Sequence, residues 1–259
     1  MSEITGRRII VTGGAGGIGA AVVRGYCAAG ARVVSMDLQD EYGQQVAAEA
    51  SDGGPGGVTY LRTDVSDPSS VDRQFAAAVA ILGGLDVLAH TAGVHRAAPA
   101  EEIEDDDWTR ILAVNAGGTM LTNRAAFEPM RAAGGGSIIN FGSNAGLAGV
   151  AGAAAYSASK GAVHSWTRTV AREWGRHNIR LNAIAPALYT PMLRERMARL
   201  NEAEREEYRA GMTGLIVLGN DFGDPMRDLV PVMVFLASEG SRFITGQVIP
   251  VDGGMGSVR

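Results

Sequence analysis

The sequence predicts an α/β fold: a single domain over residues 1–259, built on a doubly wound, mostly parallel sheet of seven strands flanked by helices. Short apolar, β-branched runs alternate with longer helical stretches along the chain, which is the pattern of strand–helix–strand units. Glycines cluster where these strands would end, as tight turns at a sheet edge require. A length of 259 residues with 46% hydrophobic content suffices for one large core.

Composition narrows the functional classes. The formal net charge of −5 gives no basic surface for nucleic acid or an anionic membrane. No apolar run is long enough to span a bilayer, and the first residues lack a secretion signal. Cys27 is the only cysteine, so we expect a reducing, cytoplasmic setting. Metal-ligand spacing is absent from the four histidines, so we expect no metal: His90, His95, His164 and His177.

The first third of the chain has the pattern of a dinucleotide site. A strand at 8–12 runs into the glycine-rich stretch 13–19, a helical stretch at 20–29 follows, and a second strand ends in Asp37. In this Rossmann-like unit, glycines let backbone N–H groups approach a pyrophosphate at the helix start. The spacing from Gly19 to Asp37 suits a carboxylate that binds a ribose 2′-hydroxyl. A plain strand-to-helix turn is the alternative.

Asp37 also favours NAD over NADP. A carboxylate there would repel a 2′-phosphate, and the next residues, Leu38 and Gln39, carry no positive charge. The nearest competing basic residues are Arg7 and Arg8, which are either solvated strand ends or contacts for a phosphate.

The remaining strands and helices place polar residues at one edge of the sheet. Further strands are expected at 58–62, 85–89, 137–141 and 179–184, with a final strand and turn within 245–254. A helix is expected at 108–131, with Asn115 inside it despite its poor helix propensity. Ser143 follows the fifth strand, at the edge where ligands bind to parallel sheets.

Tyr156 and Lys160 lie one turn apart on a helix expected at 154–176, so both project from one face. An ammonium beside a phenol favours the phenolate, and we expect it to lower the pKa of Tyr156. Such a tyrosine would accept protons near neutral pH. Taken alone, this pair is more typical of an ordinary helix surface.

Together these residues carry a family resemblance. Thr12-Gly13-x-x-x-Gly17-x-Gly19, the adenine-contact pair Asp64-Val65, and the series Asn115, Ser143, Tyr156 and Lys160 resemble the motifs of a classical short-chain dehydrogenase/reductase. The resemblance covers almost the whole chain.

The resemblance implies a role for each catalytic residue. Tyr156 exchanges a proton with the substrate oxygen, and Ser143 hydrogen-bonds the same oxygen. Lys160 lowers the tyrosine pKa and binds the nicotinamide ribose. Asn115 holds a water that links Lys160 to solvent, and hydride moves between the substrate carbon and the nicotinamide.

It also implies a set of cofactor contacts. They are Thr12, Gly13, Gly16, Gly17, Ile18, Gly19, Asp37, Leu38, Asp64, Val65, Ala92, Gly93, Tyr156, Lys160, Pro186 and Thr190. For Asp64, an exposed loop acid is the alternative.

Two stretches depart from the family pattern. His90-Thr91 replaces an Asn-Asn pair, so these side chains must supply its hydrogen bonds or the bonds are lost. Residues 186–190 are one residue shorter than usual, and Ala187 stands where glycine is common and adopts a positive φ less readily.

The resemblance makes residues 190–219 an insertion that covers the substrate. Its apolar residues suit a pocket wall, although ordinary helix packing would explain them equally well: Met192, Leu193, Met197, Met212 and Leu215. His95 is expected near the substrate, and the terminal strand implies a homotetramer.

These observations lead to one functional hypothesis and two alternatives. We expect an NAD-dependent oxidoreductase that interconverts a secondary alcohol and a ketone on a hydrophobic molecule, such as an alicyclic, terpenoid, steroid-like or aromatic alcohol. The alternatives are a 3-oxoacyl-carrier-protein reductase, which normally favours NADP, and a non-catalytic NAD(H) sensor.

Overall fold

Seven strands form one sheet at the centre of the computed structural model, which describes residues 4–190, 193, 197–198, 200–213 and 215–256. The sheet order is β3-β2-β1-β4-β5-β6-β7, and every neighbouring pair is parallel. The order reverses between β1 and β4, which makes their carboxyl ends the ligand-binding switch point of a doubly wound sheet. This confirms the predicted fold class. The strands are β1 Arg8–Thr12, β2 Arg32–Asp37, β3 Gly57–Arg62, β4 Val87–His90, β5 Gly136–Phe141, β6 Ile179–Pro186 and β7 Val248–Val251.

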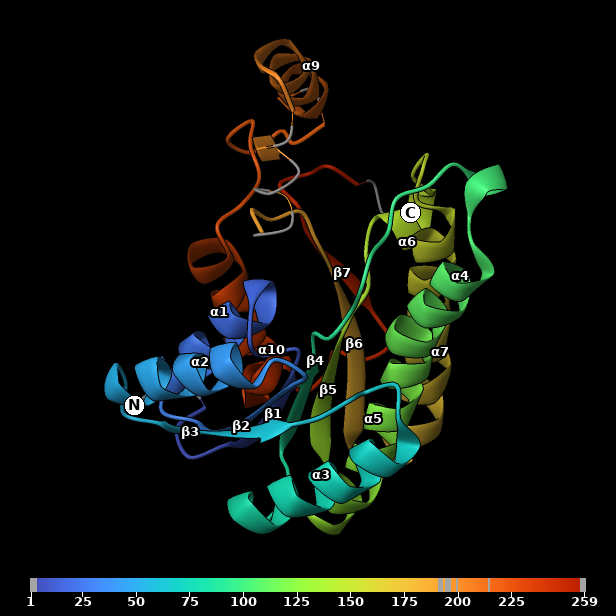
Figure 1. Cartoon of the computed structure of the whole chain (residues 1–259). Helices are drawn as coiled ribbons and strands as arrows, with labels where there is room; N and C mark the ends of the chain where they lie inside the picture. The colour runs from blue at the N-terminus through green and yellow to red at the C-terminus, as the bar shows by residue number, and fades with distance from the viewer. Residues whose placement is uncertain (1–3, 191–192, 194–196, 199, 214, 257–259) are drawn as a thin grey trace.

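Helices cover both faces of this sheet (Figure 1). One face carries α1 (Gly17–Ala28), α2 (Asp40–Asp52) and α10 (Val230–Ala237), and the other carries α3 (Pro68–Leu82), α4 (Asp105–Leu112), α5 (Gly118–Ala132) and α7 (Ala154–Trp174). Shorter helical turns are η1 Ala100–Glu102, η2 Ala113–Gly117, α6 Ala145–Ala148, η3 Gly175–His177, η4 Pro225–Leu229 and η5 Glu239–Ser241. None of the helices in the described ranges is long and apolar enough to cross a membrane.

Alternate side chains of each strand enter two separate cores, as buried parallel strands require. From β1, Ile9 and Val11 pack with α1 and α10, whereas Ile10 packs with α3 and α5. In β2, Val33 and Val34 divide between the two cores in the same way.

The helix predicted at 108–131 is interrupted. It consists of α4, a π-helical turn η2, and α5, and Asn115 lies in the π turn. A π turn inserts one residue into the helical repeat, which changes the direction of the side chains around it. The sequence correctly flagged Asn115 as out of place in a regular helix but did not predict this turn.

The 190–219 segment stands apart from the helix layers. Its described helix is α9, Glu202–Thr213, which Figure 1 shows clear of the body on the side to which β6 delivers the chain. Leu193 and Met197 are described, and Met197 is buried. Met192 and the side chain of Met212 lie outside the described part of the chain.

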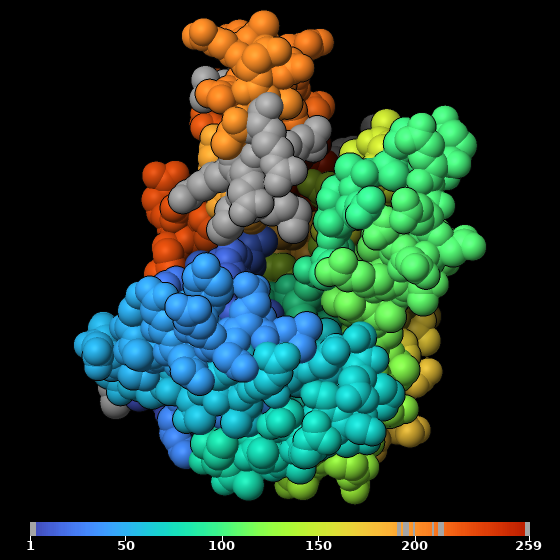
Figure 2. All heavy atoms as spheres, in the orientation of Figure 1, coloured from blue at the N-terminus to red at the C-terminus, as the bar shows by residue number. Residues whose placement is uncertain are grey.

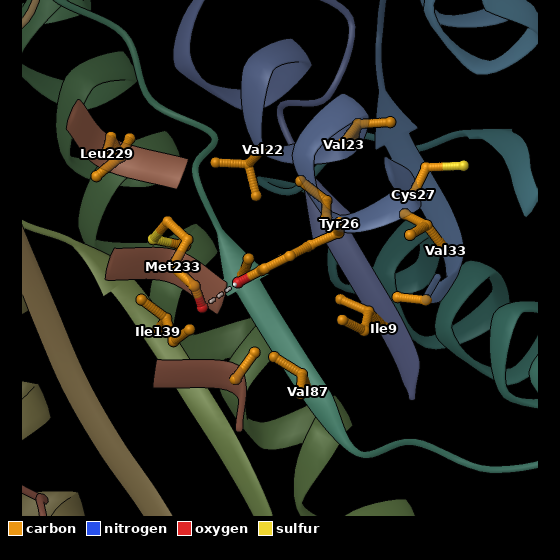
Figure 3. Packing of buried hydrophobic residues seen from close by; sticks show 14 of the residues in the cluster. Ile9, Val22, Val23, Tyr26, Cys27, Val33, Val87, Ile139, Leu229 and Met233 are labelled. Carbon is orange, nitrogen blue, oxygen red and sulfur yellow. Dashed lines mark hydrogen bonds between the residues drawn. The ribbon is translucent and has the colours of Figure 1, made fainter. Parts of the chain in front are cut away.

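Tyr26 anchors α1 to α10 through the first core (Figure 3). Its ring has no exposed surface, and its hydroxyl donates a 3.2 Å hydrogen bond to the Met233 carbonyl. The bond satisfies a polar group that burial would otherwise penalise.

Tyr26→Ala should therefore lower the free energy of unfolding by about 3–5 kcal/mol, because it removes a buried ring. Tyr26→Phe removes only the hydroxyl and should cost about 1 kcal/mol. Urea unfolding of both variants measures this, with exposed Tyr42→Ala as the control, expected within about 0.5 kcal/mol of the unsubstituted chain. Equal losses for Tyr26→Ala and Tyr42→Ala would contradict the packing argument.

Candidate active site

The glycine turn after β1 leaves the start of α1 open. Gly13 has a φ of +73°, and a Cβ there would lie 2.7 Å from the Ala92 backbone. A Cβ on Gly19 would overlap the Gly13 carbonyl. Gly16 precedes α1 with extended backbone, no side chain caps the helix, and a Cβ at Gly16 would meet only open space. The uncapped N–H groups of this 12-residue helix suit a pyrophosphate, so the site fits a dinucleotide.

Asp37 lies beside this turn. Its Oδ2 accepts a 3.1 Å hydrogen bond from the Ala15 N–H, and its Oδ1 accepts one of 3.1 Å from the Gln39 N–H. The carboxylate is thereby fixed between the glycine turn and the end of β2, where a ribose would lie. Leu38, the next residue, is half exposed.

Arg62 is a basic residue near the ribose position that the sequence argument missed. It pairs in register with Asp37 across β2 and β3. Its Nη1 donates to the Leu38 carbonyl at 2.6 Å and to Asp40 Oδ2 at 3.1 Å. The sequence could have indicated Arg62 only through the pairing of β2 with β3, because the two strands end side by side.

Arg7 and Arg8 are too far from the glycine turn to contact a cofactor phosphate. They lie at the amino end of β1, opposite the glycine turn, where Arg7 pairs with Glu239 and Arg8 with Asp86. The Arg8 Nε lies 3.0 Å from Asp86 Oδ2. The suggestion that either arginine contacts a cofactor phosphate is therefore wrong.

His90 and Thr91 both bond to Thr12. Thr91 Oγ1 donates to the Thr12 carbonyl at 2.6 Å, and His90 Nδ1 lies 2.8 Å from Thr12 Oγ1. Both side chains at the departing positions therefore bond to β1. Burial lowers the pKa of His90 to about 3, with the positive charge of Lys160 contributing, so its imidazole is neutral at pH 7.

Asp64 and Val65 lie beyond the end of β3. Asp64 Oδ1 accepts from the Ser66 N–H at 2.9 Å and from its hydroxyl at 2.6 Å. Val65 is buried against Gly118, where a Cβ would approach its Cγ2 to 3.0 Å. This turn shapes the edge of the sheet two strands from the glycine turn.

Ser143, Tyr156 and Lys160 come together at the carboxyl ends of β5 and β6. The Ser143 side chain lies close enough to the Tyr156 hydroxyl to lower its pKa, and Ser143 Oγ accepts a hydrogen bond from the Ala145 N–H at 3.1 Å. Lys160 Nζ lies 5.6 Å from the centroid of the Tyr156 ring and donates a 2.7 Å hydrogen bond to the Phe141 carbonyl. The sequence prediction that these three residues meet at this edge agrees with the geometry.

The expected lowering of the Tyr156 pKa is not found. Burial raises the pKa of Tyr156, and the nearby Ser143 hydroxyl opposes that shift only in part. The Lys160 ammonium is directed at the Phe141 carbonyl rather than at the phenol oxygen. Burial also lowers the pKa of Lys160 to about 8, which still leaves it protonated at pH 7.

Asn115 clamps the loop that follows β4. Its Oδ1 accepts from the Val94 N–H at 2.8 Å, and its Nδ2 donates to the Val94 carbonyl at 2.9 Å. The same Nδ2 group donates to Ser159 Oγ at 2.9 Å, and Ser159 donates to the Tyr156 carbonyl. A Cβ on exposed Gly93 would lie 3.2 Å from Asn115 Oδ1 and 3.4 Å from Lys160 Nζ. The π turn thus links the loop after β4 to the helix of Tyr156.

The shortened stretch after β6 is unstrained. Positive φ values among the described non-glycine residues occur at Asn178 and Asn220, so Ala187 does not need the conformation that glycine would allow. Its N–H donates to Val251 and its carbonyl accepts from Gly223. Pro186 ends β6, and Thr190 Oγ1 accepts from the Leu193 N–H at 3.2 Å.

Asn144, the residue after Ser143, makes a long-range hydrogen bond that the sequence did not predict. Asn144 Nδ2 donates to Asp252 Oδ2 at 2.9 Å, across 108 residues. Buried Asp252 also accepts from the N–H groups of Gly254 and Gly256, at 3.0 and 2.7 Å. The same terminal turn binds the end of the 190–219 insertion, because the Leu218 N–H donates to the Gly253 carbonyl at 2.9 Å.

The surface has a hollow between the blue N-terminal part and the green middle of the chain (Figure 2). No group of three His, Cys, Asp or Glu side chains within the described ranges could hold a metal ion.

Comparisons with known proteins agree with this geometry. A family model described as "Enoyl-(Acyl carrier protein) reductase" matches residues 13–256. The D-threitol dehydrogenase of Mycolicibacterium smegmatis is 36% identical, covering 97% of this chain and 94% of that protein. The 2,5-dichloro-2,5-cyclohexadiene-1,4-diol dehydrogenase LinX of Sphingobium indicum is 35% identical, covering 98% and 97%. Among solved structures, levodione reductase superposes with a TM-score of 0.90 at 28% identity, covering 97% and 98%.

Asp252→Ala should loosen the turn next to Ser143. The change leaves three donors without their charged acceptor, and we expect the free energy of unfolding to fall by about 1–3 kcal/mol. Urea unfolding and amide hydrogen exchange at Gly254 and Gly256 would measure it. Asp221→Ala, at an exposed loop acid, is the matched control. Unchanged exchange at both glycines would rule out the clamp.

Proposed function

The chain belongs to the short-chain dehydrogenase/reductase family, and from that premise we propose that it is an NAD-dependent oxidoreductase that interconverts a secondary alcohol and a ketone on a hydrophobic small molecule. The family uses nicotinamide cofactors, either NAD or NADP. The observation that carries the proposal is the grouping of Ser143 and Lys160 around the Tyr156 side chain, next to a glycine turn that fits a dinucleotide.

In the proposed mechanism, each polar group of the site has one task. Tyr156 exchanges a proton between its phenol oxygen and the reacting oxygen of the substrate. Ser143 Oγ donates a hydrogen bond to the same substrate oxygen. When bound, the nicotinamide supplies the hydride acceptor or donor. The Lys160 ammonium lies 5.6 Å from the centroid of the Tyr156 ring, where the family resemblance assigns it the binding of the nicotinamide ribose. Asn115 positions the loop after β4, and its proposed part in a proton relay rests on the family resemblance.

The apolar end of the otherwise charged 190–219 insertion supports a hydrophobic substrate. Leu215, Val217 and Leu218 are 49%, 67% and 74% exposed, and Met197 is buried at the same end of the molecule. An exposed apolar stretch beside a catalytic hollow is suited to covering an apolar ligand. The relatives above are named for D-threitol, a dichlorocyclohexadienediol and levodione, which fits an alcohol or ketone substrate.

Asp37 supports NAD as the cofactor. A carboxylate fixed by two backbone N–H groups accepts hydrogen bonds from ribose hydroxyls and repels a 2′-phosphate. Arg62 is the one feature that opposes this preference, and Asp40 partly neutralises it.

A carrier-protein reductase is the second candidate function. The description of the matching family model favours it, because that description names an acyl-carrier-protein substrate. An acidic carrier protein would need a basic docking surface, and the chain carries a net charge of −5. Turnover of free alcohols but not of acyl-carrier-protein substrates would separate the two.

We also propose a homotetramer in a reducing, cytoplasmic compartment. The edge strand β7 is partly exposed along its length, and Phe243, which precedes it, is fully exposed, as an interface would require. The single cysteine, Cys27, is buried as a free thiol. Size-exclusion chromatography with light scattering tests the assembly.

Tyr156→Phe tests the proposed activity. Removing the phenol oxygen should lower kcat for oxidation of secondary alcohols by about 10²–10⁴-fold, because proton transfer is lost. NAD binding, measured by titration calorimetry, should stay within a few fold. The control is Tyr42→Phe, the same substitution at an exposed tyrosine on α2, which should keep full activity. Turnover that survives Tyr156→Phe would refute the assignment, and unchanged ligand responses without any turnover would indicate a sensor.

Asp37→Ala tests the choice of cofactor. Without the carboxylate, the ratio of the NADP to the NAD dissociation constant should fall by about tenfold or more, since both the attraction to ribose and the repulsion of phosphate are lost. Asp52→Ala, an exposed acid on α2, is the control and should leave the ratio unchanged. A preference for NADP in the unsubstituted protein would assign Arg62, not Asp37, as the selecting residue.

A further inference from the structure

We propose that His95 determines substrate specificity by hydrogen-bonding a second oxygen of the substrate, on the carbon next to the one that is oxidised or reduced. The preferred substrates are then cyclic vicinal diols and the corresponding 2-hydroxyketones. The inference rests on the proposed function and adds the substrate class.

His95 is placed directly against the catalytic tyrosine. Its ring centroid lies 4.7 Å from that of Tyr156, and the two ring planes meet at 81°, an edge-to-face contact. Lys160 approaches the same tyrosine ring through its Nζ at 5.6 Å. His95 is only partly buried, and neighbouring Gly93 is exposed, so the imidazole lies at the open part of the site.

The loop that carries His95 is held on both sides of the residue. Asn115 bonds both the N–H and the carbonyl of Val94. Beyond His95, Arg96 Nε lies 2.7 Å from Asp107 Oδ2. The Ala98 N–H donates to the Gly152 carbonyl at 3.0 Å, just before the helix of Tyr156 begins. A ring fixed in this way is preorganised, so little ordering cost is left for ligand binding.

The chemistry of imidazole suits a hydroxyl or carbonyl oxygen. A neutral imidazole has one donor and one acceptor nitrogen, so it can bind either group. The proposed anchor for the reacting oxygen is Tyr156 with Ser143, and the His95 ring adjoins the tyrosine ring. An oxygen one carbon away from the reacting oxygen would therefore fall beside His95. A site built to bond a polar group discriminates against analogues that lack it.

The reaction leaves the second oxygen unchanged. Oxidation of the diol breaks one C–H and one O–H bond at a single carbon. The hydride goes to NAD⁺, the proton goes to Tyr156 and then to solvent, and the product is a 2-hydroxyketone. His95 takes no part in electron or proton transfer, so it is a specificity residue and not a catalytic one.

The test compares cyclohexane-1,2-diol with cyclohexanol. His95→Phe keeps an aromatic ring against Tyr156 but removes both nitrogens, and should lower kcat/KM for the diol about tenfold, the value of one hydrogen bond. Cyclohexanol should change by less than about twofold, since it has no second oxygen. His95→Asn, which restores a donor and an acceptor, should recover part of the diol preference.

His177→Phe is the matched control. His177 also makes an edge-to-face contact, with Phe127 at 5.4 Å, but on η3 at the other edge of the sheet. It should leave both probes unaffected. Equilibrium binding of each probe to the complex with NADH, followed by nucleotide fluorescence, gives a readout without turnover, and His95→Phe should weaken diol binding about tenfold there too.

The inference is overturned if the unsubstituted protein binds the two probes equally or binds neither. It is also overturned if His95→Phe loses activity toward both probes alike, or toward neither of them. The proposed function fails separately, when turnover persists in Tyr156→Phe. A preference for cyclohexanol over the diol would also overturn the role of His95 while leaving the oxidoreductase intact.

Discussion

The contact of Thr12 with His90 and Thr91 ties together the two strands between which the sheet order reverses. The Thr12 carbonyl accepts from both the N–H and the hydroxyl of Thr91, and its hydroxyl lies against His90. Two parts of the site begin within a few residues of it. The glycine turn leaves from Thr12 in one direction, and the loop to Gly93 leaves from Thr91 in the other, so the nucleotide cradle and the substrate loop share one anchor.

Lys160 is the buried side chain that carries a positive charge near this anchor. His90 and His164 flank the region of Lys160, and burial lowers their pKa values to about 3 and about 4. Both imidazoles are therefore neutral at pH 7, while Lys160, with a pKa of about 8, stays charged. A second positive charge in this low-dielectric region would lower the pKa of Lys160 further. Neutral histidines thus lie near Lys160 without competing with its charge.

The sequence was sufficient for features that are local or periodic. The short apolar, β-branched runs predicted the strands to within a few residues. The positions of Ser143, Tyr156 and Lys160 in the chain predicted that their side chains meet. The direction of the Tyr156 pKa was not predictable, because it depends on burial and on where the Lys160 ammonium points. Arg62 was missed because its neighbour in space belongs to another strand.

The Asn144–Asp252 hydrogen bond has a consequence for the order of assembly during synthesis. A chain emerges from the ribosome amino end first. The residues of the glycine turn, Asp37 and His90 are made early, but helix α1 packs on α10, which is made near the end of the chain. The turn beside Ser143 likewise waits for a carboxylate made 108 residues after Asn144. Both halves of the site are thus completed by the C-terminal part of the chain.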